Sequence, residues 1–275
     1  MTVLLRVIDD PELAAGVTGS TLRLDDSSLV ALGLAFDLAR RLDGVDLSAA
    51  AAGPAEWDVA LREALALGVA RVMRTWDDDL TLPDIPATSA ALATAIPGDA
   101  DLVLAGGPAS DHGSGVLPGA VAQVLGLPLL AEVTAIESGP EGLVAMTRGD
   151  GGRRRRFALP ARAVLVAARM PAPGLFPPLA RRLAARKQPI ALVPPGEGGL
   201  TTGTAERLAI LDYGPARPLT RHLLKPSATA NPADRLRQLM SGGMSGRGGK
   251  TLDSGGGGGM AGQLAEILVR EGYLA

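Results

Sequence analysis

The residues best suited to chemistry lie between Ala105 and Pro118, in the stretch AGGPASDHGSGVLP. The apolar run Asp101–Leu104 precedes this stretch and an apolar helical pattern follows it, so we expect a buried strand that leads through a loop into a helix. Glycine permits positive φ and close backbone approach, serine supplies hydroxyl groups, and the first turn of a helix directs free N–H groups at an anion. The stretch predicts a phosphate-binding loop with a nucleotide as its natural ligand, and an ordinary strand-to-helix loop is the alternative.

The elements that must position this loop follow from the first 130 residues. Strands are expected at 2–8, 46–52, 70–75 and 101–105, and helices at 29–42, 55–68, 88–96 and 119–126. This alternation is typical of a parallel sheet covered by helices on both faces, whose ligands bind at the carboxyl ends of the strands. The expected fold class is α/β, with a doubly wound, mainly parallel sheet of the Rossmann-like type.

The pattern changes after residue 130. Short segments at 132–137, 143–148 and 153–159 are separated by GPEG and GDGG, which predicts an added antiparallel hairpin region. The basic run Arg153–Arg156 is expected on an edge strand that faces solvent or a partner. An apolar strand at 163–167 follows, and then a proline-rich segment leads into a short basic helix, LARRLAARKQ, that another protein could grasp.

The last third of the chain is rich in Gly, Pro and Ser at 194–203 and 241–259, which predicts linkers, with helices at 235–240 and 261–272. A chain that extends in this way is expected to wrap a partner. We therefore predict an α/β domain at 1–190 and an extended, partner-wrapping C-terminal arm with a terminal helix at 191–275.

Composition excludes several classes of protein. The 275 residues contain no cysteine, so the chain has no disulfide, thiolate zinc site, cysteine-ligated cluster or thiol nucleophile. The two histidines, His112 and His222, lie far apart, which argues against a histidine metal site or a Ser-His-Asp hydrolase. A net charge of −2 argues against nucleic acid as a partner. No apolar run is long enough to span a membrane, and we expect a cytoplasmic protein without a metal site.

Several segments resemble the beta subunits of electron transfer flavoproteins. Residues 53–71, GPAEWDVALREALALGVAR, are similar to a GPA segment of that family. Asp101–Gly106, Asp111 and Leu125–Pro128 match its DLVLxG strand, the aspartate of its nucleotide loop and its LGLP helix end. Residues 159–171 and 179–189 resemble its LPAVV strand and LPxIMxAKKKP recognition loop, with Ala180 where the family has proline. The resemblance covers about residues 1–190. Residues 261–274 look like its closing helix, and the Gly-rich insert before them is unusual.

The resemblance implies an electron carrier rather than an enzyme. It implies an adenine nucleotide alpha hydrolase-like fold and a heterodimer with an alpha subunit that binds the redox-active FAD, while this chain holds AMP in a structural role. Electrons would come from flavin-dependent dehydrogenases and pass to a downstream acceptor. In members that bifurcate electrons, a second FAD occupies the AMP site. Val116, Leu117 and Pro118 stand where the family often has polar residues, so a site without nucleotide is also open.

The resemblance also assigns residues. Those implied to bind the nucleotide are Arg6, Ser27, Ser28, Leu29, Val30, Ala52, Gly106, Gly107, Pro108, Ala109, Ser110, Asp111, His112, Gly113, Ser114, Gly115, Val116 and Leu117. Those implied to dock a dehydrogenase are Phe176, Leu179, Arg181 and Arg182. Two other functions remain as alternatives, a scaffolding subunit without nucleotide and an ATP-binding regulator or adenylate-forming enzyme. Lysine occurs only at 187, 225 and 250, which disfavours such an enzyme.

Overall fold

The fold is described from a computed structural model. It describes residues 1–10, 21–77, 84–108, 114–139 and 142–195, and, near the C-terminus, Asn231, Ala233, residues 262–266 and Val269. The chain divides into two compact units, Met1–Leu211 and Asp212–Ala275. All the elements named below belong to the first unit.

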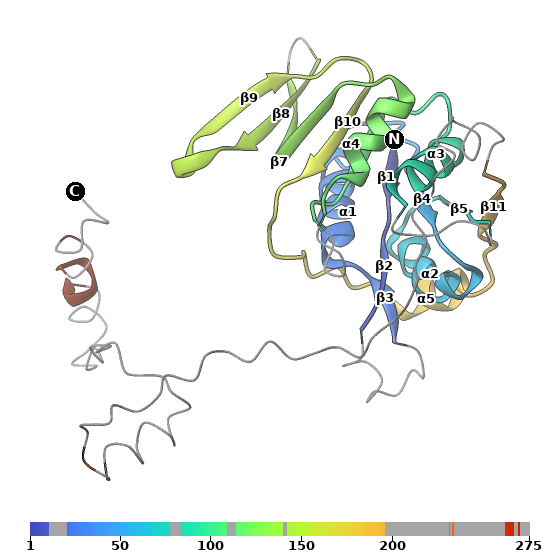
Figure 1. The fold of residues 1–275 in the computed structure, drawn as a ribbon, viewed down its shortest axis with the longest axis horizontal. Coiled ribbons are helices and arrows are strands. Elements are labelled where there is room, and N and C mark those ends of the chain that lie inside the picture. Colours follow the sequence, from blue (N-terminus) through green and yellow to red (C-terminus); the bar gives the residue numbers. More distant parts are fainter. Residues whose placement is uncertain are drawn as a thin grey trace. The chain divides into compact units, whose positions relative to one another are not determined.

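The first unit is built on a nine-stranded sheet (Figure 1). In sheet order the strands are β11 (Ala191–Val193), β5 (Arg71–Thr75), β4 (Ser48–Ala52), β1 (Thr2–Leu4), β6 (Leu102–Ala105), β10 (Ala163–Ala167), β7 (Leu129–Gly139), β8 (Gly142–Arg148) and β9 (Arg154–Ala158). Every neighbouring pair from β11 to β7 is parallel, whereas β7 with β8 and β8 with β9 are antiparallel. The α/β class, the mainly parallel sheet and the antiparallel addition are confirmed.

Helices cover both faces of the parallel region. They are α1 (Asp26–Ala39), α2 (Asp58–Leu67) after the single turn η2 (Ala55–Trp57), α3 (Ile85–Ala95), α4 (Leu117–Leu125) and α5 (Leu179–Ala185). Successive strand residues point to opposite faces, so Val3 joins one hydrophobic core with α1 and α2, and Leu4 joins the other with α3 and α4. Both residues are buried.

Strand β4 consists of a serine and four alanines, a poor strand by propensity. Burial overrides that propensity, because Ala49, Ala50 and Ala51 are fully inaccessible between the two helical layers. The strand is also paired on both sides, with β1 and with β5.

The prediction of one strand over Thr2–Ile8 is wrong. Strand β1 ends at Leu4, and β2 (Val7–Asp9) pairs instead with β3 (Leu22–Leu24) in a separate antiparallel sheet. The start of α1 causes this break: the Arg6 backbone N–H donates to the Ser28 Oγ at 2.8 Å, and the Asp25 N–H donates to the Arg6 carbonyl at 2.9 Å. These bonds take the backbone groups that would otherwise continue the strand.

Other boundaries differ because of capping. Helix α1 begins at Asp26, since the Asp25 side chain accepts the Ser27 N–H, and α3 begins at Ile85, since Asp84 accepts the Ala87 N–H. Both caps lie about one helical turn before the starts that hydrophobic periodicity predicted, at residues 29 and 88.

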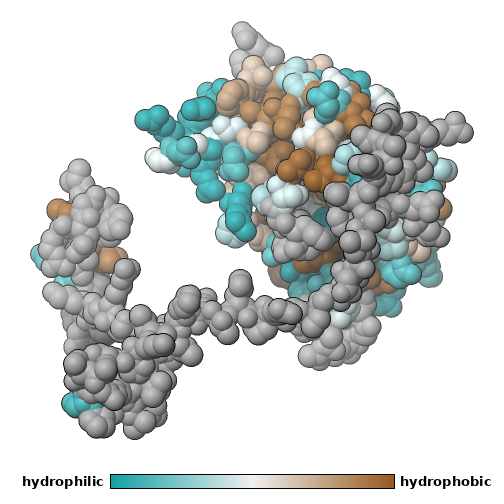
Figure 2. Space-filling model, in the orientation of Figure 1, coloured by the Kyte–Doolittle hydropathy of each residue, from teal (hydrophilic) through white to brown (hydrophobic). Residues whose placement is uncertain are grey.

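Strand β9 forms the outer edge of the antiparallel addition, as predicted for Arg153–Arg156. All five of its residues are exposed on both faces. Figure 2 shows this end of the sheet as a hydrophilic surface. Charged side chains on an exposed edge oppose unspecific strand pairing.

The C-terminal predictions lie mostly outside the described residues. Residues 262–266 are helical and exposed, within the helix expected at 261–272. The linkers at 196–203 and 241–259 and the helix at 235–240 are not described. Across the described ranges, no helix has the length and apolar character needed to cross a membrane.

Candidate functional site

The sheet reverses its strand order at β1. The chain places β4 and β5 on one side of β1, and β6 and β10 on the other. Ligands of doubly wound sheets bind at the carboxyl ends of the strands beside such a switch point. Arg6, Gly53 and Gly106 follow β1, β4 and β6, so three of the loops predicted to form the site meet there.

The loop after β6 packs directly on the first turn of α1. A Cβ atom added to Gly106 would lie 2.5 Å from both the carbonyl carbon and the carbonyl oxygen of Ser27. Glycine is therefore required at position 106 for close approach, as the sequence indicated. The backbone it approaches is that of Ser27, so this glycine serves the assembly of the site.

The first turn of α1 is already capped by a carboxyl group. The buried Asp25 carboxylate accepts the Ser27 N–H at 2.9 Å and the Ser27 hydroxyl. The Ser28 hydroxyl accepts the Arg6 N–H. Leu29 packs against the core and Val30 is buried within it. Of the predicted contacts at 27–30, the Ser27 hydroxyl and N–H and the Leu29 N–H thus bond Asp25, and the Ser28 and Val30 side chains are buried.

The first turn of α4 differs, because no side chain caps it. Val116 occupies the N-cap position without a side-chain hydrogen bond, and Pro118 lies in the first turn. Gly115 adopts a φ of 63°, the left-handed conformation that the sequence predicted for this loop. Ser114, Gly115 and Val116 are exposed. Of α1 and α4, it is therefore α4 whose first turn, among the described residues, has N–H groups open to an anion.

The remaining part of the predicted phosphate loop lies outside the described residues. It comprises Ala109, Ser110, Asp111, His112 and Gly113. The loop residues on either side of it are described. Pro108 packs against Gly115, where an added Cβ would lie 3.2 Å from the Pro108 Cγ. This contact brings the two ends of the loop together.

A stack of side chains borders the site at the end of β4. The Arg6 guanidinium carbon lies 5.2 Å from the centroid of the Trp57 ring. Trp57 is buried, and its ring presses on Gly53, where an added Cβ would lie 2.2 Å from the Trp57 Cε3. Ala52, the predicted contact before Gly53, is also buried.

Arg74 is a charged group in this region that was not predicted from the sequence. Arg74 on β5 is only 8% exposed. Its Nε donates to the Asp58 Oδ1 at 2.7 Å, and its Nη1 donates to the Gly53 carbonyl at 3.1 Å. The available signal was an arginine directly after the apolar residues Val72 and Met73 of a strand, because a cation at a buried strand position needs polar partners.

The predicted docking segment presents apolar side chains to solvent. Phe176 is 85% exposed, Leu179 is 71% exposed and Leu183 is 51% exposed. Leu179 and Leu183 lie four residues apart on α5 and so share one face of the helix, and Phe176 lies in the segment that leads into it. We call these three residues the apolar stripe.

Contacts on both sides of the apolar stripe fix it to the body. Pro173 packs on α1 at Gly33, where an added Cβ would lie 2.9 Å from the Pro173 Cγ. Ala185 is buried, and the Arg181 Nη1 donates to the Leu67 carbonyl at the end of α2, at 3.5 Å. Arg181 thus interacts with the C-terminal end of a helix, while Arg182 is exposed and basic at the surface.

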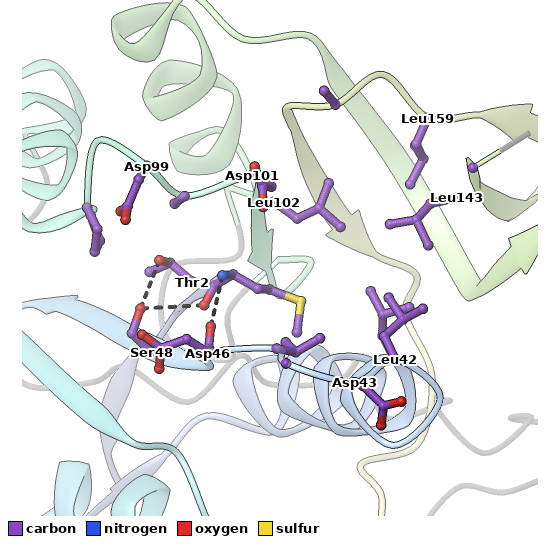
Figure 3. A pocket seen from close by; sticks show the side chains of 18 of the residues that line it. Thr2, Leu42, Asp43, Asp46, Ser48, Asp99, Asp101, Leu102, Leu143 and Leu159 are labelled. Atoms are coloured by element: carbon purple, nitrogen blue, oxygen red, sulfur yellow. Dashed lines mark hydrogen bonds between the residues drawn. The ribbon is translucent and has the colours of Figure 1, made fainter.

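A further cavity, which the sequence did not predict, opens at the amino ends of the strands (Figure 3). Its volume is about 790 Å³, and Asp43, Asp46, Asp99, Asp101 and Arg71 are among its lining residues. The Thr2 and Ser48 hydroxyl groups bond each other at 3.0 Å, and the chain's amino group donates to the Asp46 carbonyl. Within the described ranges, no acidic or histidine cluster could hold a metal ion.

Comparison with known proteins gives the class of this chain. A family model, the electron transfer flavoprotein domain, matches residues 17–197, which include the α1, β6 and α4 segments of the site. An electron transfer flavoprotein subunit beta from Syntrophomonas wolfei is 33% identical over 175 residues, covering 63% of this chain and 68% of the relative. The subunit beta of Mycobacterium leprae is 33% identical over 99 residues, covering 34% of this chain and 37% of that relative. The chain belongs to the electron transfer flavoprotein beta-subunit family.

Proposed function

We propose that this chain pairs with an FAD-binding alpha subunit and forms with it a heterodimeric electron carrier. Membership of the family, over residues 17–197, is the observation that supports this proposal. The heterodimer would accept electrons from flavin-dependent dehydrogenases and deliver them to a downstream acceptor. The redox-active group would be the FAD of the partner, and this chain would carry out no bond chemistry. The 1–190 region would be the Rossmann-like, adenine nucleotide alpha hydrolase-like domain, and 191–275 would wrap the partner.

We further propose that AMP binds at the switch point of the sheet. The single observation that favours a phosphate there is the first turn of α4, which lacks a side-chain cap and follows a glycine with positive φ. The phosphate would accept N–H groups of Gly115, Val116 and Leu117, with Ser114 beside them. The ribose and base would lie toward α1 and β4, near Ser28 and Ala52.

Donor dehydrogenases would bind at the apolar stripe. Exposed apolar anchors held on a rigid frame supply much of the energy in protein interfaces. The frame here is provided by Pro173 on α1 and by Ala185 and Arg181 near α2. The surrounding positive charges of α5, Arg182, Arg186 and Lys187, would steer an acidic dehydrogenase surface into place.

The nucleotide assignment is tested by releasing and identifying bound nucleotide. The full chain is purified, denatured and separated by chromatography, with AMP and FAD as standards. AMP in the released fraction supports the assignment. FAD in stoichiometric amount on the isolated chain would instead support a second flavin of the bifurcating type, and no nucleotide would support a scaffolding role.

A further inference from the structure

The turn between β4 and α2, residues 53–58, is tied to the neighbouring strand β5 at both of its ends. The Gly53 N–H donates to the Thr75 carbonyl at 3.1 Å, and the Gly53 carbonyl accepts the Arg74 Nη1. Asp58, at the other end of the turn, accepts the Arg74 Nε. One guanidinium group therefore spans the whole turn.

The geometry requires arginine rather than any cation. Arg74 reaches two acceptors on separate parts of the turn, the Gly53 carbonyl and the Asp58 carboxylate, with two different nitrogens. The planar fork of arginine fixes both bonds at once, whereas a lysine ammonium is a single point of attachment. Ion pairs of low exposure add little stability compared with well-packed apolar residues, so we assign this pair to the orientation of the turn rather than to stability.

Trp57 connects the turn that Arg74 holds to the side chain of Arg6. The indole ring lies inside the turn and presses on Gly53, so its position follows that of the turn. The Arg6 guanidinium in turn lies over the Trp57 ring at the carboxyl end of β1. A guanidinium held at this edge of the sheet favours an anionic ligand there.

We propose that Arg74 is a positioning residue for the nucleotide site: through Gly53 and Asp58 it holds Trp57, and through Trp57 it holds Arg6 beside the nucleotide. This inference rests on the proposed binding of AMP at the switch point. Arg74 acts from the strand next to the site and makes no contact with the nucleotide itself.

The test measures AMP affinity of the full chain by isothermal titration calorimetry in Arg74→Met, Arg74→Lys and Asp58→Asn. The matched control is Arg71→Met, which removes an exposed ion pair with Asp46 at the far end of the same strand. We expect Arg74→Met to weaken AMP binding at least tenfold, Arg74→Lys to restore part of the loss, and Arg71→Met to stay within twofold of the unaltered chain.

A spectroscopic readout separates positioning from general stability. In a Trp76→Phe background, Trp57 is the sole tryptophan. Its emission is expected to shift to longer wavelength in Arg74→Met and to stay unchanged in Arg71→Met. If Arg74→Met does not fold, Asp58→Asn takes its place, because it keeps the side-chain shape and lies at the more exposed end of the pair.

The outcomes are distinct. Weaker AMP binding with a shifted Trp57 emission and retained far-ultraviolet circular dichroism supports the inference. Unchanged AMP affinity in a folded Arg74→Met or Asp58→Asn variant overturns it while the nucleotide site stands. Absence of AMP binding by the unaltered chain overturns the proposed site, and with it this inference.

Discussion

Replacing Leu179 by alanine tests the docking proposal most sharply, because the side chain is 71% exposed and supports almost nothing within its own subunit. It lies at the start of α5, in the middle of the apolar stripe. Exposing this leucine side chain to water is unfavourable in free energy. A partner that covers the side chain removes that unfavourable term. The substitution should therefore affect binding of the donor dehydrogenase and leave the fold unchanged.

The size of the effect follows from the exposed fraction. Burying a whole leucine side chain contributes about 1.5–3 kcal/mol, so covering the exposed part of Leu179 contributes roughly 1–2 kcal/mol. This corresponds to a loss of about 5- to 30-fold in affinity for the dehydrogenase. The thermal midpoint should change little, since removing an exposed side chain away from special features typically alters stability by no more than about 0.5 kcal/mol.

The assay is the rate of flavin reduction in the heterodimer, measured against increasing concentrations of its donor dehydrogenase. Leu179→Ala should raise the concentration needed for half-maximal rate and leave the maximal rate and the FAD content unchanged. The control is Leu192→Ala, in which a leucine that is 61% exposed is removed from the edge strand β11. A lower melting temperature with unchanged transfer would refute the reasoning, because it would place Leu179 in a packing role.

Three further predictions test other parts of the molecule. Gly115→Val should release the bound nucleotide, since a β-branched residue adopts a φ of 63° only with strain, and nucleotide content after denaturation measures this. Gly106→Ala should lower the free energy of unfolding by about 1–3 kcal/mol, because the added Cβ overpacks against Ser27. Gly98→Ala is the control, since no atom lies within 4 Å of its added Cβ, and denaturant titration compares the two variants. The rate of electron transfer from the dehydrogenase should fall as salt is raised, because the basic side chains of α5 steer association; constant rates from low to high salt would contradict this.

The sheet could be predicted from the sequence because its strands are buried on both faces. Val3 and Leu4 are consecutive and both apolar because each faces a different hydrophobic core. A parallel strand that is covered by helices on both faces produces this continuous apolar pattern. The helix starts could be predicted less well, because side chains such as Asp25 and Asp84 set them through single hydrogen bonds. Hydrophobic periodicity contains no information on those bonds.

The end of β1 shows why part of the site could not be predicted. The residues Val7 and Ile8 continue the apolar pattern of the first strand, so the sequence predicts one long strand. The break at Arg6 depends on bonds to Ser28 and Asp25, about twenty residues away in the chain, and such long-range bonds leave no local signal. The buried pair of Arg74 and Asp58 likewise joins a strand to a helix through the fold alone.

The loop after β6 was predictable in kind but not in detail. Its small residues predicted close approach and positive φ, and Gly106 and Gly115 meet those two requirements separately. The sequence could not tell that Gly106 approaches Ser27 or that α1 is capped by a carboxylate while α4 has no cap. That difference between two helix starts is what orients the proposed nucleotide.

We propose that this chain functions only as one half of a flavin carrier. The most direct measurement is the flavin content of the full chain purified alone and after coexpression with an electron transfer flavoprotein alpha subunit. Under this proposal we expect a colourless chain alone and a yellow heterodimer with stoichiometric FAD that a donor dehydrogenase reduces. Failure to form a complex with the alpha subunit, or the same amount of FAD on the chain by itself, would contradict it.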